Sequence, residues 1–462
     1  MRGGVGTQTL DHAAGSAAPA QALDQLIQAA FQHQRAGQYA LAEPMYRKVL
    51  REAPDHLDAT FLLGIVCSET GRNEMAVDLI AKAVALEPGI ADFHAGLGNA
   101  QKNCGDHAAA AKSFQRALEL DPKNYQAYSH YLELALNRKI AFEGELPDIL
   151  LRSTPFIQGF QVEITTDCNL KCGECPRTLG INEGTWNNRH MPVEEFRKIV
   201  ANAPASQLVI LQGVGEPTLH PQMHELVTIA RASGKFNLIT FNTNGLARSM
   251  PYYEKLRDAG LTTISLSVDS LTQEIADRCR HGTKVEKLKT RVQQLKQVFP
   301  QMVVTLVASK MNFDDIPVTL RWLNAAGQFA VEIQPMIDFR PGAGASNSLS
   351  RADLRLLTGR LLAMRDEIPR IQLVNESMSN QPAADRKRCG KPFYSPYVMV
   401  DGSLTPCCVL YDKSIYGHTS LLETGIEAAW DSPAISGWHR SYIRESPKVC
   451  TGCCFNPETF AD

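Results

Sequence analysis

The first third of the amino-acid sequence repeats with a period of 34 residues, and no other feature limits the possible folds as strongly. Three residue types recur in phase: Gly37, Gly71 and Gly105; Ala42, Ala76 and Ala110; and Pro54, Pro88 and Pro122. Glycine permits the tight turn after a helix, alanine lets two helices approach, and proline ends a helix. A single helix pair cannot bury its apolar face alone. The period therefore predicts three stacked helix pairs, at residues 23–56, 57–90 and 91–124, with a capping helix at 125–137.

This pattern resembles the tetratricopeptide repeat (TPR), a helical repeat family. The resemblance implies a curved array whose concave face binds a protein or a peptide. Arrays of this kind also serve as dimerisation surfaces or as intramolecular docking platforms, and the sequence leaves these roles open. Residues 1–22 precede the array and contain no continuous hydrophobic segment, so we expect a flexible leader rather than a secretion signal.

Composition excludes several classes of protein. The chain has 462 residues, of which 44% are hydrophobic and 21% charged, as in an ordinary globular protein. Its net charge of -2 gives no indication of nucleic acid or an anionic membrane as a partner. No apolar run reaches the roughly 18 residues that cross a bilayer, so we expect a cytoplasmic protein. Nine of its twelve cysteines fall in three groups, which favours metal binding.

The first cysteine group lies in the middle of the chain. A linker is expected at residues 138–155, and a strand at 160–164 runs into the sequence TTDCNLKCGECPR. The cysteines Cys168, Cys172 and Cys175 are spaced C-x3-C-x2-C. Three thiolates on one loop can bind three irons of a cubane cluster and leave the fourth iron without a protein ligand. A structural zinc site usually has four ligands with paired C-x2-C spacing, so zinc is the weaker interpretation.

Strand-like and helix-like segments alternate after this loop. A strand is expected at residues 207–211, and further strands within 236–245, 261–270, 303–312 and 330–338. The first of these leads into QGVGEPTLHP, where Gly213, Gly215 and Glu216 place backbone groups and one carboxylate at the end of a strand. Such groups could bind an amino group. Six strand–helix units predict a parallel, partly closed barrel with its ligand at the carboxyl ends of the strands.

Four motifs together resemble the radical S-adenosylmethionine (SAM) enzyme superfamily over residues 159–339. They are the three-cysteine loop, the GEP segment, TNG after the third strand and SVDS after the fourth. The resemblance implies a partial (β/α)6, TIM-like barrel and a [4Fe-4S] cluster on the three cysteines, whose open iron binds SAM. An electron, supplied by a donor such as flavodoxin or ferredoxin, then cleaves SAM. The resulting 5'-deoxyadenosyl radical abstracts a hydrogen atom from the substrate.

The resemblance also implies roles for residues that bind SAM. It assigns the GEP residues to the methionine amino group, Ser267 and Asp269 to the ribose or carboxylate region, and Asn244 to the cavity wall. From the residues alone, Asn244 could instead cap a helix, and Ser267 and Asp269 could be polar residues at a barrel mouth. The residue before the third cysteine is often aromatic in this superfamily, but here it is Glu174, so no adenine contact is assigned to it.

Other candidates follow the fourth strand or face the expected barrel mouth. Cys279 is a candidate hydrogen-atom donor to a product radical, against the alternative of a packed thiol. Arg280 and His281 are candidate contacts for an anionic substrate or SAM. The titratable side chains that could face the mouth are Glu183, His220 and Glu332.

The remaining cysteines lie near the C-terminus, after a linker and helix at residues 341–385. Over 386–462 a hairpin at 397–405 is expected to bring two of them together. Four thiolates bind zinc or a cubane cluster, and local spacing alone favours zinc. The segment resembles the SPASM extension of radical SAM enzymes, in its shortened one-cluster form called twitch. This resemblance implies one auxiliary [4Fe-4S] cluster, with Cys408 and Cys454 as adjacent alternative ligands. The assigned ligands are Cys389, Cys407, Cys450 and Cys453.

The sequence therefore favours a radical SAM oxidoreductase whose auxiliary cluster assists electron transfer. A peptide or protein docked by the repeats is the favoured substrate, because the array offers a groove. The alternatives are a dehydrogenase or epimerase of a carbohydrate or aminocyclitol, and a non-catalytic repeat scaffold with an iron-sulfur or zinc module.

Overall fold

A computed structural model of the chain describes residues 17–142, 146–152, 156–337, 347–373, 389–408, 419–445 and 450. The chain divides into two compact units, Met1–Ala141 and Phe142–Asp462. No helix of the described residues is both long and apolar enough to cross a bilayer. The expected Cys453 and Cys454 ligands lie outside the described residues.

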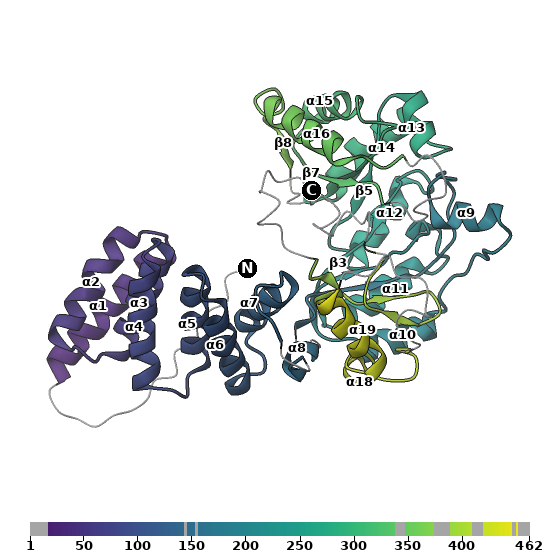
Figure 1. Ribbon diagram of the computed structural model, residues 1–462. Coiled ribbons are helices and arrows are strands. Elements are labelled where there is room, and N and C mark those ends of the chain that lie inside the picture. Colours follow the sequence, from purple (N-terminus) through teal and green to yellow (C-terminus); the bar gives the residue numbers. More distant parts are fainter. Residues whose placement is uncertain are drawn as a thin grey trace. The chain divides into compact units, whose positions relative to one another are not determined.

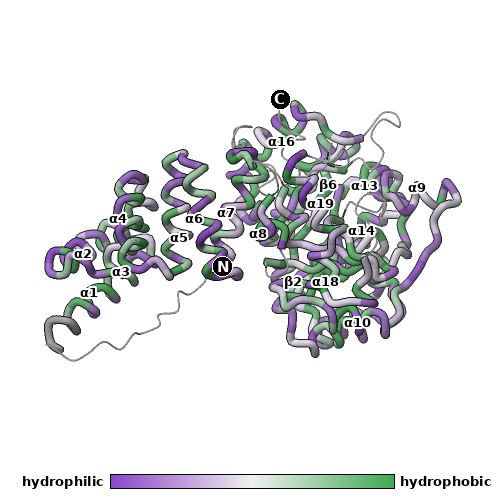
Figure 2. The backbone as a smooth tube through the Cα atoms, turned by 60° about the horizontal axis from the view of Figure 1, so that its bottom comes forward, coloured by the Kyte–Doolittle hydropathy of each residue, from purple (hydrophilic) through white to green (hydrophobic). Residues whose placement is uncertain are grey.

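The first unit is a stack of antiparallel helix pairs (Figure 1). Its helices are α1 (Ala17–Arg35), α2 (Tyr39–Glu52), α3 (Leu57–Glu69), α4 (Asn73–Leu86), α5 (Ala91–Asn103), α6 (His107–Leu120) and α7 (Tyr125–Leu136). Helix α1 begins before Leu23, where the repeat alone would start it. Hydrophobic and hydrophilic residues alternate along these helices (Figure 2), as expected when one face of each helix is buried. The predicted helical repeat array is confirmed.

The in-phase residues have the structural roles that their spacing predicts. Gly37, Gly71 and Gly105 have φ angles of 72°, 78° and 84°, in the left-handed region that glycine enters without strain. The in-phase alanines are fully buried, as are the larger residues four positions after each of them. These larger residues are Tyr46, Ile80 and Phe114.

Close helix packing inside a repeat depends on Gly98. A Cβ atom added there would lie 2.6 Å from the ring of the fully buried Phe114. We expect Gly98→Val to destabilise the first unit, because overpacking costs about 1–3 kcal/mol and the gain in helix propensity over glycine is only about 0.5 kcal/mol. Hydrogen exchange of α5 and α6 in the full chain measures the effect. Gly89→Val is the matched control, since only the Glu87 side chain comes within 4 Å of its added Cβ; equal exchange in both variants would contradict the prediction.

The second unit is a curved parallel sheet covered by helices. Its strands are β1 (Gly159–Val162), β2 (Ser206–Ile210), β3 (Phe236–Thr240), β4 (Asn242–Thr243), β5 (Ser265–Ser267), β6 (Val303–Ala308), β7 (Phe329–Pro335) and β8 (Ile371–Leu373). They form two hydrogen-bonded sheets, with β1-β2-β3 in one and β4-β5-β6-β7-β8 in the other. Only Phe241 separates β3 from β4, and its carbonyl accepts a hydrogen bond from the amide of Ser265, so the sheet continues across the break.

Helices alternate with these strands, as the six-unit pattern predicts. They are α9 (Pro176–Asn182), α10 (Val193–Asn202), α11 (Met223–Ala232), α12 (Met250–Asp258), α13 (Gln273–Cys279), α14 (Val285–Val298), α15 (Ile316–Ala326) and α16 (Arg351–Ala363). Amphipathic helices such as α10 bury Phe196 and Ile199 against the sheet. The predicted partial barrel is confirmed.

The expected C-terminal hairpin forms, and it joins the barrel sheet. Its strands β9 (Tyr397–Val398) and β10 (Leu404–Thr405) are antiparallel, and β9 also pairs in parallel with β1. The full order at this edge is β10-β9-β1-β2-β3. Short helices accompany the hairpin: α8 (Asp148–Leu151), α17 (Lys391–Tyr394), α18 (Ile426–Trp430) and α19 (Pro433–Arg444). The hairpin is therefore part of the barrel sheet, although the sequence placed it in a separate segment.

Candidate cysteine-lined cofactor site

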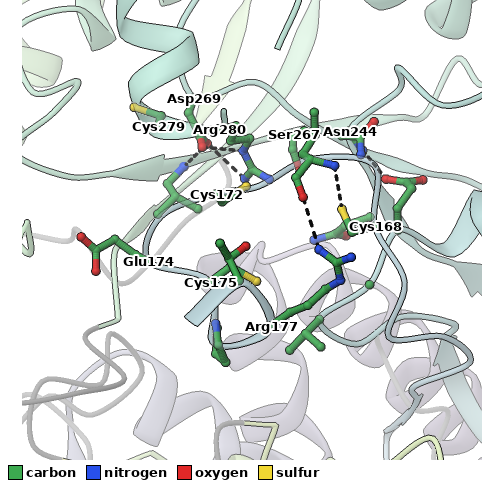
Figure 3. Close-up of a pocket in the computed structure, with 18 of the residues that line it drawn as sticks. Cys168, Cys172, Glu174, Cys175, Arg177, Asn244, Ser267, Asp269, Cys279 and Arg280 are labelled. Carbon is green, nitrogen blue, oxygen red and sulfur yellow. Dashed lines mark hydrogen bonds and ion pairs between the residues drawn. The ribbon is translucent and has the colours of Figure 1, made fainter. Parts of the chain in front are cut away.

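A cavity of about 320 Å³ lies at the carboxyl ends of the barrel strands (Figure 3). The loops after β1, β2, β4, β5, β6 and β7 all contribute to its wall. Among the lining residues are Cys168, Cys172, Cys175, Gly213, Gly215, Glu216, Asn244, Ser267, Asp269, Cys279 and Arg280. The barrel therefore brings together around one space the cysteines assigned to the first cluster, the residues that the resemblance assigned to SAM and the candidate hydrogen-atom donor. Of the two further candidate contacts, Arg280 lines this space and His281 does not.

The three-cysteine loop is held by backbone and side-chain hydrogen bonds. The Leu170 amide donates to the Cys168 Sγ at 3.4 Å, and the Cys168 amide donates to Asp167 Oδ1 at 2.9 Å. Asp167 Oδ1 also accepts from Asn188 Nδ2 at 2.7 Å and from Arg177 Nη2 at 3.4 Å. Burial raises the pKa of the Cys168 thiol to about 12. The loop thus has a fixed shape, and its three cysteines are half-buried at the cavity.

A cationic side chain lies beside these thiols. Arg280 forms an ion pair with Asp269, with Nε 2.5 Å from Oδ2 and Nη2 3.3 Å from Oδ1. Asp269 Oδ1 also accepts from the Val307 amide at 2.9 Å. Burial opposes the charge of Arg280, but Asp269 and the Cys172 thiol raise its pKa above the usual value. Burial raises the pKa of Cys172, and Arg280 acts in the opposite direction. The site therefore holds an Arg280–Asp269 ion pair beside the cysteine loop.

The GEP loop contains two glycines at which there is no space for a side chain, Gly215 because of close backbone atoms and Gly213 because of the Glu163 side chain. A Cβ on Gly215 would lie 2.4 Å from the Thr165 carbonyl oxygen and 2.7 Å from the Asp167 carbonyl oxygen. A Cβ on Gly213 would lie 2.2 Å from Glu163 Oε1. The backbone of this loop is consequently exposed to the cavity with no side chain at either glycine.

The carboxylate of Glu216 is engaged inside the protein. Its Oε1 accepts from the hydroxyl groups of Thr218 and Thr243, both at 2.6 Å, and its Oε2 accepts from the Asn244 amide at 2.8 Å. Burial raises the pKa of Glu216, and these hydrogen bonds act in the opposite direction. The side chain thus joins the GEP loop to the TNG segment, which the sequence alone did not indicate.

Asn244 and Ser267 are both buried walls of the cavity. Asn244 Nδ2 donates to Asn169 Oδ1 in the cysteine loop at 2.9 Å, and Asn244 Oδ1 accepts from the Leu246 amide at 2.9 Å. Asn244 is therefore a wall residue that also caps a turn. It does not cap the following helix, the alternative that the sequence left open, because α12 begins at Met250 with Ser249 as its N-cap. Arg177 and Asn169 were missed, although both lie within or next to the C-x3-C-x2-C segment.

The remaining candidates separate into those at the cavity and those away from it. Cys279 ends α13 and lines the cavity, and burial raises its pKa to about 12. His281 is exposed and pairs with Asp277. His220 is buried, with its ring nitrogens 2.8 Å from the Met191 carbonyl and 3.1 Å from the Gln222 amide. Glu183 and Glu332 do not line the cavity in the described part of the chain; Glu332 Oε1 accepts from Gln334 Nε2 at 2.8 Å.

The C-terminal cysteines are described only in part. Cys389, Cys407, Cys408 and Cys450 are all half-buried. The Cys407 amide donates to Thr405 Oγ1 at 3.2 Å, which fixes the chain just after β10. A hydrogen bond with Cys407 lowers the pKa of Cys408 to about 7. The choice between them as a ligand stays a prediction.

Comparison with known proteins agrees with this geometry. Residues 162–323 match the model of the Radical SAM superfamily, and residues 33–100 and 91–124 match two models of the tetratricopeptide repeat. The GTP 3',8-cyclase of Chlorobaculum tepidum is 27% identical over 186 residues, which cover 39% of this chain and 54% of that protein. The tungsten-containing aldehyde ferredoxin oxidoreductase cofactor-modifying protein of Pyrococcus furiosus is 27% identical over 192 residues, covering 39% and 52%. The chain spans about half the length of these curated relatives.

Solved structures share the fold of the second unit. The structure of anSMEcpe with bound S-adenosylmethionine aligns with a TM-score of 0.52 at 15% identity, covering 65% of this chain and 88% of that one. Streptococcus suis SuiB bound to S-adenosylmethionine aligns with a TM-score of 0.50 at 17% identity, covering 78% and 83%. SuiB has also been solved with its precursor peptide SuiA. Both neighbours were solved with S-adenosylmethionine bound.

The fold and the cavity define a class, a partial barrel with a three-cysteine loop at the carboxyl ends of its strands. Over residues 162–323 the chain is similar to the Radical SAM superfamily, and its N-terminal array is similar to the tetratricopeptide repeat.

Proposed function

We propose that the chain binds a [4Fe-4S] cluster and SAM in the barrel cavity and abstracts a hydrogen atom from a peptide or protein substrate. The observation that carries this proposal is the meeting of three cysteines from one loop, two side-chain-free glycines and a cation around a single cavity. The donor set fits the cofactor, since thiolates are the usual ligands of iron-sulfur clusters. The cavity also offers exposed backbone next to the cysteine loop.

Each residue has a role that follows from its position. Cys168, Cys172 and Cys175 would hold the cluster, which when reduced supplies the electron that cleaves SAM. The Gly213 and Gly215 backbone would bind the methionine amino group, because the Glu216 carboxylate already accepts hydrogen bonds from within the protein. The other proposed roles are those expected from the sequence: Ser267 and Asp269 would contact the ribose or carboxylate region of SAM, and Asn244 would form part of the cavity wall. Cys279 would donate a hydrogen atom to a product radical.

Arg280 would supply electrostatic stabilisation in this site. Its charge lies beside the Cys172 thiol and is oriented by Asp269, so it would favour both the anionic cluster and a ligand carboxylate. Asp269 would therefore act partly through Arg280 rather than only through a direct contact with ribose.

The TPR array supports a peptide or protein as substrate, and the fold shared with SuiB is consistent with this class. We also propose one auxiliary [4Fe-4S] cluster, held by Cys389, Cys407, Cys450 and Cys453, that accepts an electron from the substrate radical. Cys407 lies two residues after the hairpin that joins the barrel sheet, and its amide donates to Thr405 Oγ1, which supports a fixed position of this cysteine relative to the barrel.

The test is the formation of 5'-deoxyadenosine from SAM by the anaerobically reconstituted and reduced protein, measured by mass spectrometry. We expect turnover from the native chain and none from Cys172→Ala. No turnover by native protein with reduced clusters would favour a non-catalytic scaffold.

A truncated chain that begins at residue 138 separates the substrate classes. We expect it to cleave SAM in the absence of substrate as the full chain does, but to lose action on a peptide that needs the array for docking. Equal action of both chains on a carbohydrate would instead support the sugar-modifying alternative.

A further inference from the structure

One buried carboxylate in the second unit has no part in the proposed reaction. Glu163 follows β1 directly and is 2% exposed. Burial raises its pKa, whereas hydrogen bonds from the backbone amides of Val214 and Val400 favour the ionised form. A buried carboxylate is costly to retain unless its hydrogen bonds hold other groups in place.

The two oxygens of this carboxylate bind two segments far apart in the sequence. Oε1 accepts from the Val214 amide at 3.1 Å, in the GEP loop. Oε2 accepts from the Val400 amide at 3.1 Å, in the C-terminal hairpin. Gly213 leaves the space that the carboxylate occupies, since an added Cβ would lie 2.2 Å from Oε1. Glu163 therefore spans the proposed SAM-binding loop and the hairpin.

The hairpin connects this contact to the cysteines by a short and ordered path. The backbone amide of Glu163 donates to the Val398 carbonyl at 2.8 Å, which fixes the start of the turn. The turn closes with Met399 donating to the Ser403 carbonyl at 2.8 Å, and the chain then reaches Thr405 and Cys407. Gly402 in this turn has a φ of 81° and packs closely against Leu422. A Cβ atom added to Gly402 would lie 2.4 Å from Cγ of Leu422.

We propose that Glu163 is a positioning residue that couples the GEP loop to the Cys407 hairpin, so that a change in the hairpin alters the loop and its affinity for SAM. The SAM part of this inference rests on the function proposed above. The GEP loop and the hairpin are far apart in the sequence. Each donates one backbone hydrogen bond to the Glu163 carboxylate, and this pair of hydrogen bonds links them.

The coupling is testable by hydrogen exchange of the full chain without added ligand. Gly402→Ala strains the turn and loosens the hairpin. In the native background we expect about tenfold faster exchange both in the hairpin and at the Val214 amide, the size of effect that follows from weakening one charged hydrogen bond. In a Glu163→Gln background we expect Gly402→Ala to affect the hairpin only. The Val214 and Val400 amides donate to different oxygens of Glu163, and glutamine replaces one of these oxygens by an NH2 group, which cannot accept.

The outcomes are distinct. Unchanged exchange at Val214 in the Gly402→Ala chain would overturn the coupling, and this single variant decides the matter even if Glu163→Gln does not fold. Asp315→Asn is the matched control, because Asp315 is also a buried carboxylate but binds Ser270 and Thr272 on the other side of the barrel. We expect it to change exchange in neither segment.

SAM binding gives the second readout, by equilibrium dialysis of the reconstituted protein. We expect Gly402→Ala to weaken SAM affinity about tenfold in the native background and not further in Glu163→Gln. Additive effects of the two substitutions on SAM affinity would overturn the link to SAM. Coupled exchange with no SAM binding by the native chain would support the link between the two segments and overturn the function proposed for the loop.

Discussion

Replacing Cys168, Cys172 and Cys175 together by alanine is expected to abolish SAM cleavage and to halve the iron content. The native chain, anaerobically reconstituted, should contain about eight irons, and the triple variant about four, if each of two clusters holds four. The loss follows from the geometry, because these three thiols belong to one loop at the cavity and the auxiliary ligands lie on other segments. Iron analysis and absorption spectra of both chains measure the effect.

The matched control is Cys104→Ala, since Cys104 is an exposed thiol of the repeat unit and should leave iron content unchanged. A fall from about four irons to none would mean that the C-terminal cysteines bind zinc or no metal. The electron-transfer role proposed for them would then be withdrawn, whereas the barrel site would stand.

Gly215→Ala is expected to reduce SAM affinity by about ten- to a hundredfold, the equivalent of about 1–3 kcal/mol of overpacking. The added Cβ would meet two backbone carbonyl oxygens, of Thr165 and Asp167, and backbone atoms cannot move aside as the end of a flexible side chain can. Both carbonyls belong to the segment that leads into Cys168, so the GEP loop and the cysteine loop would be forced apart. Equilibrium dialysis with labelled SAM measures the change.

Gly173→Ala is the control for this second prediction. Gly173 lies inside the cysteine loop, between Cys172 and Cys175, but nothing lies within 4 Å of an added Cβ. We expect it to bind SAM as the native chain does. If both glycine variants bound SAM with native affinity, close backbone approach at Gly215 would not be required for the ligand.

The sequence alone predicted those parts of the molecule that have a local or periodic signal. The glycines at 34-residue intervals determine turns with positive φ, and the alternation of strands and helices determines the barrel. The cysteine loop and the GEP loop were found because each is contiguous. They meet because the carboxyl ends of parallel strands lie at one end of a barrel.

Long-range polar contacts were not predictable in the same way. Nothing near Glu216 indicates that Thr243 and Asn244 bind its carboxylate, because these residues are on the following strand–helix unit. The pairing of Arg280 with Asp269 depends on how α13 packs after β5. The pairing of β9 with β1 joins residues from opposite ends of the second unit. No motif in either segment indicates that the two strands pair.

That last pairing affects how the chain can fold as it is synthesised. Strand β1 hydrogen-bonds on one side to β2, which follows soon after it, but on the other side to Tyr397 and Val398. Until those residues leave the ribosome, one edge of the first barrel strand has no native partner, and an open edge can pair with strands of other chains. Contacts of such sequence separation also form slowly. A nascent chain stalled before residue 397 would therefore expose an aggregation-prone edge that the finished protein covers with its own hairpin.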